Sequence, residues 1–144
     1  MDKKVLIFGT FDGLHDGHIF FISQAKKVAE NLIICVARDE IVFTIKNHYP
    51  KKSLENRMRI LSEKFTKAII LAGDEALQKW SAVLEHKPEI IALGYDQMTL
   101  YQALSKDREL FPFLKDIIII KDHRGQELHS SILNYKNIKK YENT

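Results

Sequence analysis

The sequence has few of the features that mark secreted and membrane proteins. It contains a single cysteine, Cys35, so no disulfide can form within the chain, and a buried structural thiol is expected. The longest apolar runs, such as residues 117–120, are far too short to cross a bilayer. No apolar segment with a small-residue cleavage site follows the N-terminus. These absences predict a cytoplasmic protein without a membrane partner.

The chain also lacks a strong charge of one sign. Its formal net charge is +3, and its basic residues form no dense stripe interleaved with aromatic residues. We therefore expect no nucleic-acid partner, whereas the weak positive balance suits a small anionic substrate. With 144 residues, 45% hydrophobic and 28% charged, the composition is that of one globular domain over residues 1–144.

Glycine is scarce as well, yet three of the six glycines fall within ten residues near the N-terminus. Residues 9–18 read Gly-Thr-Phe-Asp-Gly-Leu-His-Asp-Gly-His, between an apolar run and an amphipathic stretch. A strand that turns into a helix predicts an anion site, because the first N–H groups of the helix have no intrahelical partner. His15 and His18 can face one small volume if the helix begins near Asp16. Either histidine alone would be read as a solvated loop residue; the combination favours a functional site.

Apolar runs and amphipathic segments alternate along the rest of the chain. This pattern predicts strands at residues 5–8, 32–37, 67–71, 89–93 and 117–120, and helices at 18–30, 54–64, 75–86, 97–106 and 130–140. Ser53 is expected to cap the second helix and Asp74 the third, whereas residues 38–52 read as a loop or a short irregular helix. The fold class is therefore α/β, with a doubly wound, parallel, five-stranded sheet that binds ligands at the carboxyl ends of its strands.

Further polar residues follow the predicted strands. Gly94 and Asp96 come after the fourth strand, and Asp96 can accept a hydrogen bond from a base amine or a sugar hydroxyl, or cap the next helix. His129, Ser130 and Ser131 come after the fifth strand, where a simple helix cap would explain Ser130 alone. These positions all meet at one edge of the predicted sheet.

The opening segment resembles the signature of the HxGH nucleotidyltransferases, whose cytidylyltransferase-like branch carries G-T-F-D-x-x-H-x-G-H. The resemblance implies a Rossmann-like fold of the HUP type. It also implies that His15 and His18 hold a nucleoside triphosphate and stabilise charge during attack on its α-phosphate. In the same comparison Thr10 and Phe11 contribute backbone amides, while Gly9 and Gly17 shape the turn around the nucleotide.

Later segments of the chain are similar to the same family. The resemblance implies that Lys46 and Arg57 reach back to the phosphates, although as bare charges both would be read as solvated surface. It places Gly94 and Asp96 beside the base and ribose, and it places the terminal group at the β- and γ-phosphates. That group consists of His129, Ser130 and Ser131. Ile132 stands where many members carry a basic residue.

The segments at residues 36–40, 94–97 and 129–131 look most like the archaeal-type FAD synthases. This resemblance implies transfer of AMP from ATP to FMN, giving FAD and pyrophosphate, with Mg²⁺ bridging the phosphates and no metal site built from the protein alone. A CTP-dependent cytidylyltransferase of the glycerol-3-phosphate type is the alternative enzyme, and a non-catalytic nucleotide-binding domain is the alternative of another class. A homodimer remains open, because family members are often dimers.

Overall fold

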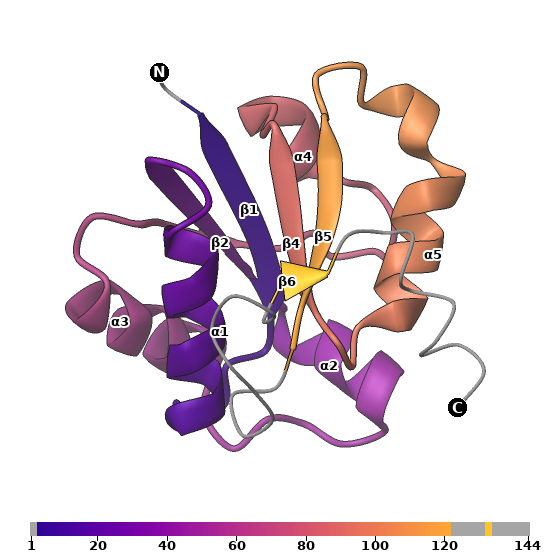
Figure 1. Ribbon diagram of the computed structural model, residues 1–144. Helices are drawn as coiled ribbons and strands as arrows, with labels where there is room; N and C mark the ends of the chain where they lie inside the picture. The colour runs from indigo at the N-terminus through magenta and orange to yellow at the C-terminus, as the bar shows by residue number, and fades with distance from the viewer. Residues whose placement is uncertain (1–2, 122–131, 134–144) are drawn as a thin grey trace.

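A six-stranded sheet forms the centre of the computed structural model, which describes residues 3–121 and the backbone of residues 132–133 (Figure 1). The strand order is β3-β2-β1-β4-β5-β6. The strands are β1 (Lys4–Gly9), β2 (Asn31–Val36), β3 (Ile69–Ala72), β4 (Ile90–Gly94), β5 (Asp116–Ile120) and β6 (Ile132–Leu133). The first five strands are parallel, which confirms the predicted five-stranded doubly wound sheet.

The short strand β6 was not expected. It pairs antiparallel with β5, with Leu133 opposite Ile119 and Ile132 opposite Ile120. The prediction of a helix over residues 130–140 is therefore wrong at these two positions, because two apolar residues next to an open sheet edge gain more from pairing with it than from a local helix signal. The other residues of that predicted helix lie outside the described part of the chain.

Five helices and one 3-10 turn connect the described strands. They are α1 (Asp16–Lys26), α2 (Asp39–Lys46), α3 (Leu54–Lys64), α4 (Ser81–His86), α5 (Met98–Lys106) and η1 (Arg108–Leu110). Residues 39–46 thus form a regular helix, and α1 begins at Asp16, as a common orientation of the two histidines requires. In Figure 1, α2 lies beyond the carboxyl ends of β1 and β2, away from the two helical layers. No helix within the described residues combines the length and apolar character needed to cross a membrane.

The predicted helix at residues 75–86 begins later than expected, at Ser81. Gln78 and Trp80 have φ values of 60° and 58°, which an α-helix cannot hold. Trp80 adopts this conformation with its ring buried in the core and its Nε1–H donating to Asp107 Oδ2 at 2.7 Å. The N-cap residue is Trp80, so the prediction that Asp74 caps a helix beginning at Glu75 is wrong. Asp74 Oδ2 nevertheless accepts from the first N–H of the helix, that of Ser81, at 3.0 Å.

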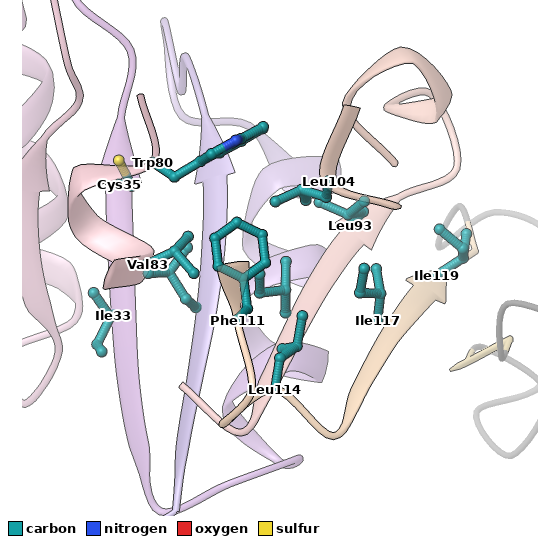
Figure 2. Close-up of a cluster of buried hydrophobic side chains, with 12 residues drawn as sticks. Ile33, Cys35, Trp80, Val83, Leu93, Leu104, Phe111, Leu114, Ile117 and Ile119 are labelled. Carbon is teal, nitrogen blue, oxygen red and sulfur yellow. The ribbon is translucent and has the colours of Figure 1, made fainter. Parts of the chain in front are cut away.

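Side chains of the strands alternate between two apolar clusters, one on each face of the sheet. Figure 2 shows the cluster in which Val83 of α4, Leu104 of α5 and Phe111 pack toward strand residues. The strand members of this cluster are Leu6, Ile33, Cys35, Ile91, Leu93, Ile117 and Ile119. The other cluster packs β1, β2 and β5 against Ile22 of α1 and Leu61 of α3. Burial on both faces explains the continuous apolar runs of the sequence.

Candidate active site

The order of the strands fixes where a ligand can bind. The chain passes from β1 to β2 and β3 on one side, then returns to β4 and β5 on the other side of β1. The topological switch point therefore lies between β1 and β4, where open α/β sheets bind their ligands. The turn after β1 holds the two histidines, and the turn after β4 holds Gly94 and Asp96. The fold thus brings these two predicted segments to one crevice.

At the switch point the ladder between β1 and β4 ends early. Pairing of the two strands runs only from Val5 opposite Ile90 to Ile7 opposite Ala92. Beyond it, Gln97 bridges the gap: its Nε2–H donates to the Phe8 carbonyl at 3.0 Å, and its Oε1 accepts from the Gly94 N–H at 2.8 Å. The side chain replaces two missing backbone bonds. Sequence reasoning missed this role because the length of a ladder is not visible in a local motif.

The rings of His15 and His18 lie against each other. Their centroids are 3.7 Å apart and their planes differ by 19°, so the imidazoles are stacked. The buried ring of Phe11 meets His18 edge-on at 5.5 Å between centroids. The histidines therefore face one common environment, as the sequence predicted, and Phe11 contributes a supporting ring besides its backbone.

Backbone hydrogen bonds fix the tautomers of both histidines. His15 Nδ1 accepts from the N–H of Gly17 at 3.0 Å and of His18 at 3.4 Å, while His18 Nδ1 accepts from the N–H of His15 at 3.4 Å. An imidazole nitrogen that accepts cannot carry a proton, so each neutral ring bears its proton on Nε2. In its neutral form each ring can therefore donate a hydrogen bond through Nε2.

This reciprocal cap changes how the start of α1 can bind an anion. The N–H groups of Gly17 and His18, which the helix itself cannot satisfy, are taken by His15 Nδ1. The positive end of the helix is therefore presented through the imidazole rings rather than through these bare amides. An anion bound here would therefore contact the outer edge of the imidazole rings, one ring farther from the helix than the backbone N–H groups.

The electrostatic surroundings of His18 show which other groups converge on the site. Burial lowers the pKa of His18 below its usual value, and the charges of His15 and Lys46 lower it further. The carboxylates of Asp96 and Asp12 act in the opposite direction. Lys46 and Asp96 were predicted from segments far apart in the sequence. Both are thus close enough to His18 to shift its pKa.

Two predicted glycines make room for their neighbours. A Cβ on Gly9 would lie 2.5 Å from the ring of Phe11, and a Cβ on Gly94 would lie 2.8 Å from Asp96 Oδ1. Phe11 itself has a φ of 52°, a strained conformation for a residue with a Cβ. The close approach of Phe11 and Asp96 to the backbone therefore depends on glycine at these two positions.

Arg57 is completely buried beneath the turn that carries the histidines. Its Nη1 donates to the carbonyls of Thr10 at 2.9 Å and Ala37 at 2.8 Å, its Nε donates to the Lys52 carbonyl at 3.0 Å, and its Nη2 pairs with Asp39. Four of the five guanidinium donors are thus used inside the protein. This placement favours a positioning role for Arg57 over the phosphate contact that the sequence predicted.

Asp12 ties a second segment to the site. Its Oδ2 and Oδ1 accept from the backbone N–H groups of Lys51 at 2.7 Å and Lys52 at 2.9 Å. Although burial acts to raise the pKa of Asp12, these hydrogen bonds hold it below its usual value. The loop after α2 is therefore attached to the opening turn by an ionised carboxylate.

The remaining predicted contacts lie outside the described residues. They are His129, Ser130 and Ser131. Within the described residues, no group of three or more His, Cys, Asp or Glu side chains is arranged to hold a metal ion. Mg²⁺ in nucleotide sites is held largely by substrate phosphates and water, and needs no such group of protein side chains.

Comparison with known proteins decides the family. The sequence pattern of the cytidylyltransferase-like family matches residues 6–135. The chain belongs to this family. Among curated cytidylyltransferase-like relatives, it is 34% identical over 132 residues to an FAD synthase of Ferroglobus placidus, covering 90% of this chain and 83% of that one. It is also 44% identical over 98 residues to an FAD synthase of Archaeoglobus profundus, covering 65% of this chain and 59% of that protein, less than two thirds of its length.

Solved structures agree with the family assignment. A lipopolysaccharide core biosynthesis protein from Thermoplasma volcanium superposes with a TM-score of 0.70 at 32% identity, covering 86% of this chain and 98% of that one. A pantoate-beta-alanine ligase from Thermus thermophilus superposes with a TM-score of 0.56 at 14% identity, covering 99% of this chain and 65% of that one. The second likeness shows only that the fold is shared.

Proposed function

We propose that this chain is an FMN adenylyltransferase, which joins ATP and FMN to give FAD and pyrophosphate. The observation that carries the proposal is the stacked histidine pair at the switch point, with both Nε2–H groups available as donors. The adenylyl donor and the flavin acceptor come from the similarity to archaeal FAD synthases. The ATP would lie along the crevice between β1 and β4, with its base toward Asp96.

The reaction needs charge stabilisation more than a base. The second pKa of a phosphate monoester is about 6, so the FMN phosphate is already an anionic nucleophile near neutral pH. Its oxygen forms a bond to the α-phosphorus, the bond from that phosphorus to the bridging oxygen breaks, and pyrophosphate leaves with the electron pair. Mg²⁺ bound with the triphosphate would neutralise part of the phosphate charge.

The histidines would meet the charge that develops on the phosphate oxygens. Neutral Nε2–H donors held by backbone bonds need no reorganisation during the reaction, which is the condition for electrostatic stabilisation. Lys46 would add a mobile positive charge from α2, because its side chain is exposed and acts on His18. Arg57 and Gln97 would act indirectly, by fixing the turns that carry Thr10 and Gly94.

Product analysis with purified protein tests the proposal. We expect FAD from ATP, FMN and Mg²⁺, and a loss of kcat of about a hundredfold to a thousandfold in His18→Ala. Thermal shift with ATP should still show binding by the variant. Formation of CDP-glycerol from CTP and glycerol 3-phosphate, without FAD from the first mixture, would instead establish the cytidylyltransferase. A His18→Ala variant that changes only ATP affinity would indicate a binding domain.

A further inference from the structure

Three large apolar side chains are exposed on α2 and the loop that follows it, within a short stretch of the sequence. Phe43, Ile45 and Tyr49 are three of the eight large hydrophobic residues exposed in the described part of the chain, and they fall within seven consecutive positions. Single exposed apolar residues are ordinary on a protein surface, whereas a cluster of them marks a contact surface. This cluster is therefore a candidate binding surface.

Two of these residues form a stacked aromatic pair. The ring centroids of Phe43 and Tyr49 are 4.6 Å apart and the ring planes differ by 29°. The two residues are nevertheless 41% and 60% exposed, so the pair keeps an open outer face. Aromatic rings contribute much contact area and lose little conformational freedom on binding. The Phe43–Tyr49 pair is thus a preformed flat surface.

Phe43 places this surface next to the candidate active site. It precedes Lys46 by three residues on α2, a spacing that puts neighbouring side chains on one side of a helix. The charge of Lys46 in turn lowers the pKa of His18. A molecule lying on the aromatic pair would therefore be adjacent to the groups proposed to bind phosphate.

Tyr49 is connected to the site by a second route. It stands two residues before Lys51, whose backbone N–H donates to Asp12 Oδ2 in the opening turn. Lys51 and Lys52 are both exposed and lie on the same loop. Two exposed positive side chains thus follow Tyr49 closely along the chain, and positive charge complements an anionic ligand.

We propose that the Phe43–Tyr49 pair binds the isoalloxazine ring of FMN, with the FMN phosphate directed toward Lys46 and the histidines. This inference rests on the proposed function. The acceptor of that reaction must bring its phosphate to the α-phosphate of ATP, while its tricyclic ring remains outside the phosphate site. A glycerol 3-phosphate acceptor has no ring and would give an exposed aromatic pair no purpose.

Steady-state kinetics of Tyr49→Leu test the inference. Loss of one stacking ring should raise the KM for FMN about tenfold, while the KM for ATP and the kcat stay at the wild-type values. Tyr49→Phe keeps the ring and should retain the wild-type KM for FMN. Stacking on tyrosine quenches flavin fluorescence, so titration of FMN with wild-type protein should show quenching that Tyr49→Leu weakens.

Leu110→Ala is the matched control, because Leu110 is 54% exposed in η1, which precedes β5 and belongs to none of the segments that form the candidate site. It should change neither KM. If the wild-type protein forms FAD and Tyr49→Leu has an unchanged KM for FMN, this inference is wrong and the proposed function stands. If the wild-type protein forms no FAD, both are wrong. A homodimer that Tyr49→Leu dissociates, with its FMN affinity unchanged, would assign the surface to a second copy of the chain.

Discussion

His18 differs from a free histidine because the folded chain uses its Nδ1 as an acceptor and partly buries its ring. Both effects favour the neutral form, and burial is the largest cause of the lowered pKa. Protonation would remove the acceptor for the His15 N–H and break the reciprocal cap of α1. The protonation state of this one residue therefore links the geometry of the site to pH.

We expect kcat/KM to be constant near neutral pH and to fall on an acid limb with a pKa below 6.5, the ordinary value for histidine. Stability should follow the same direction: the unfolded chain takes up the proton at about 6.5, and the folded chain takes it up only at lower pH. The contribution of His18 is thus complete above 6.5 and is lost as the pH falls through the lowered pKa. Thermal melts of wild type and His18→Gln at several pH values below and above 6.5 measure the contribution of His18 to stability. An acid limb of kcat/KM with a pKa above 6.5 would contradict the assignment of this limb to His18.

Arg57 offers a second test at the residue scale, because α3 also carries an exposed arginine for comparison. Arg57→Lys loses the planar fork that reaches the Thr10, Ala37 and Lys52 carbonyls, and should destabilise the fold by about 2 kcal/mol. The melting temperature should fall by roughly 5–10 °C. Arg59→Lys, at a residue paired with Glu63 on the surface, should cost less than about 0.5 kcal/mol. Equal losses of stability in Arg57→Lys and Arg59→Lys would show that the hydrogen bonds of Arg57 to the three carbonyls do not stabilise the fold.

At the scale of elements, the end of β4 is joined to β1 by the side chain of Gln97 rather than by backbone hydrogen bonds. Gln97→Glu preserves the shape but replaces the donor to the Phe8 carbonyl with a carboxylate oxygen, which repels it. We expect a drop in the melting temperature and a rise in the KM for ATP, because the two turns that flank the crevice would separate. Gln78→Glu, at an exposed position before α4, is the control for the added charge. An unchanged KM for ATP in Gln97→Glu would show that the bridge does not shape the crevice.

Most strands and one helix cap could be predicted from the sequence, whereas the start of α4 could not. The strands β1, β2, β4 and β5 were identified because each is buried on two faces and reads as an apolar run. The strand β3 reads as an apolar run as well, although its residues are only partly buried or exposed. The Ser53 cap is confirmed by its bond from the Asn56 N–H at 3.2 Å. The start of α4 was missed because the left-handed backbone of Trp80 depends on core packing, which no local signal encodes.

The candidate site was predictable to the same extent. The motif at residues 9–18 predicted that both histidines face one volume, and the stack confirms it. The surroundings of Arg57 were not predictable, because a sequence shows a charge but not the three carbonyls that meet around it. The role of Gln97 was not predictable either, because its two partners, Phe8 and Gly94, lie on different strands.

At the scale of the whole molecule, ligand binding should be visible as a gain in stability. A ligand present at a hundred times its Kd stabilises the folded state by about 2.7 kcal/mol. We expect ATP with Mg²⁺, and FMN, each to raise the melting temperature by several degrees, and glycerol 3-phosphate to leave it unchanged. Shifts produced by CTP and glycerol 3-phosphate instead would support the cytidylyltransferase alternative. Differential scanning fluorimetry with each compound separates these outcomes.

Arg57 has a consequence for how new acceptors could be accommodated in this fold. One guanidinium holds both Asp39 and the carbonyl of Lys52, so the chain between them leaves and returns to the same anchor. Residues 40–51 therefore form a segment whose two ends are held by the same side chain. Grafting the corresponding segment of a relative with another acceptor, while keeping Asp39, Lys46, Lys51, Lys52 and Arg57, is therefore a rational route to altered acceptor choice, because the contacts of this segment with the histidine site are retained.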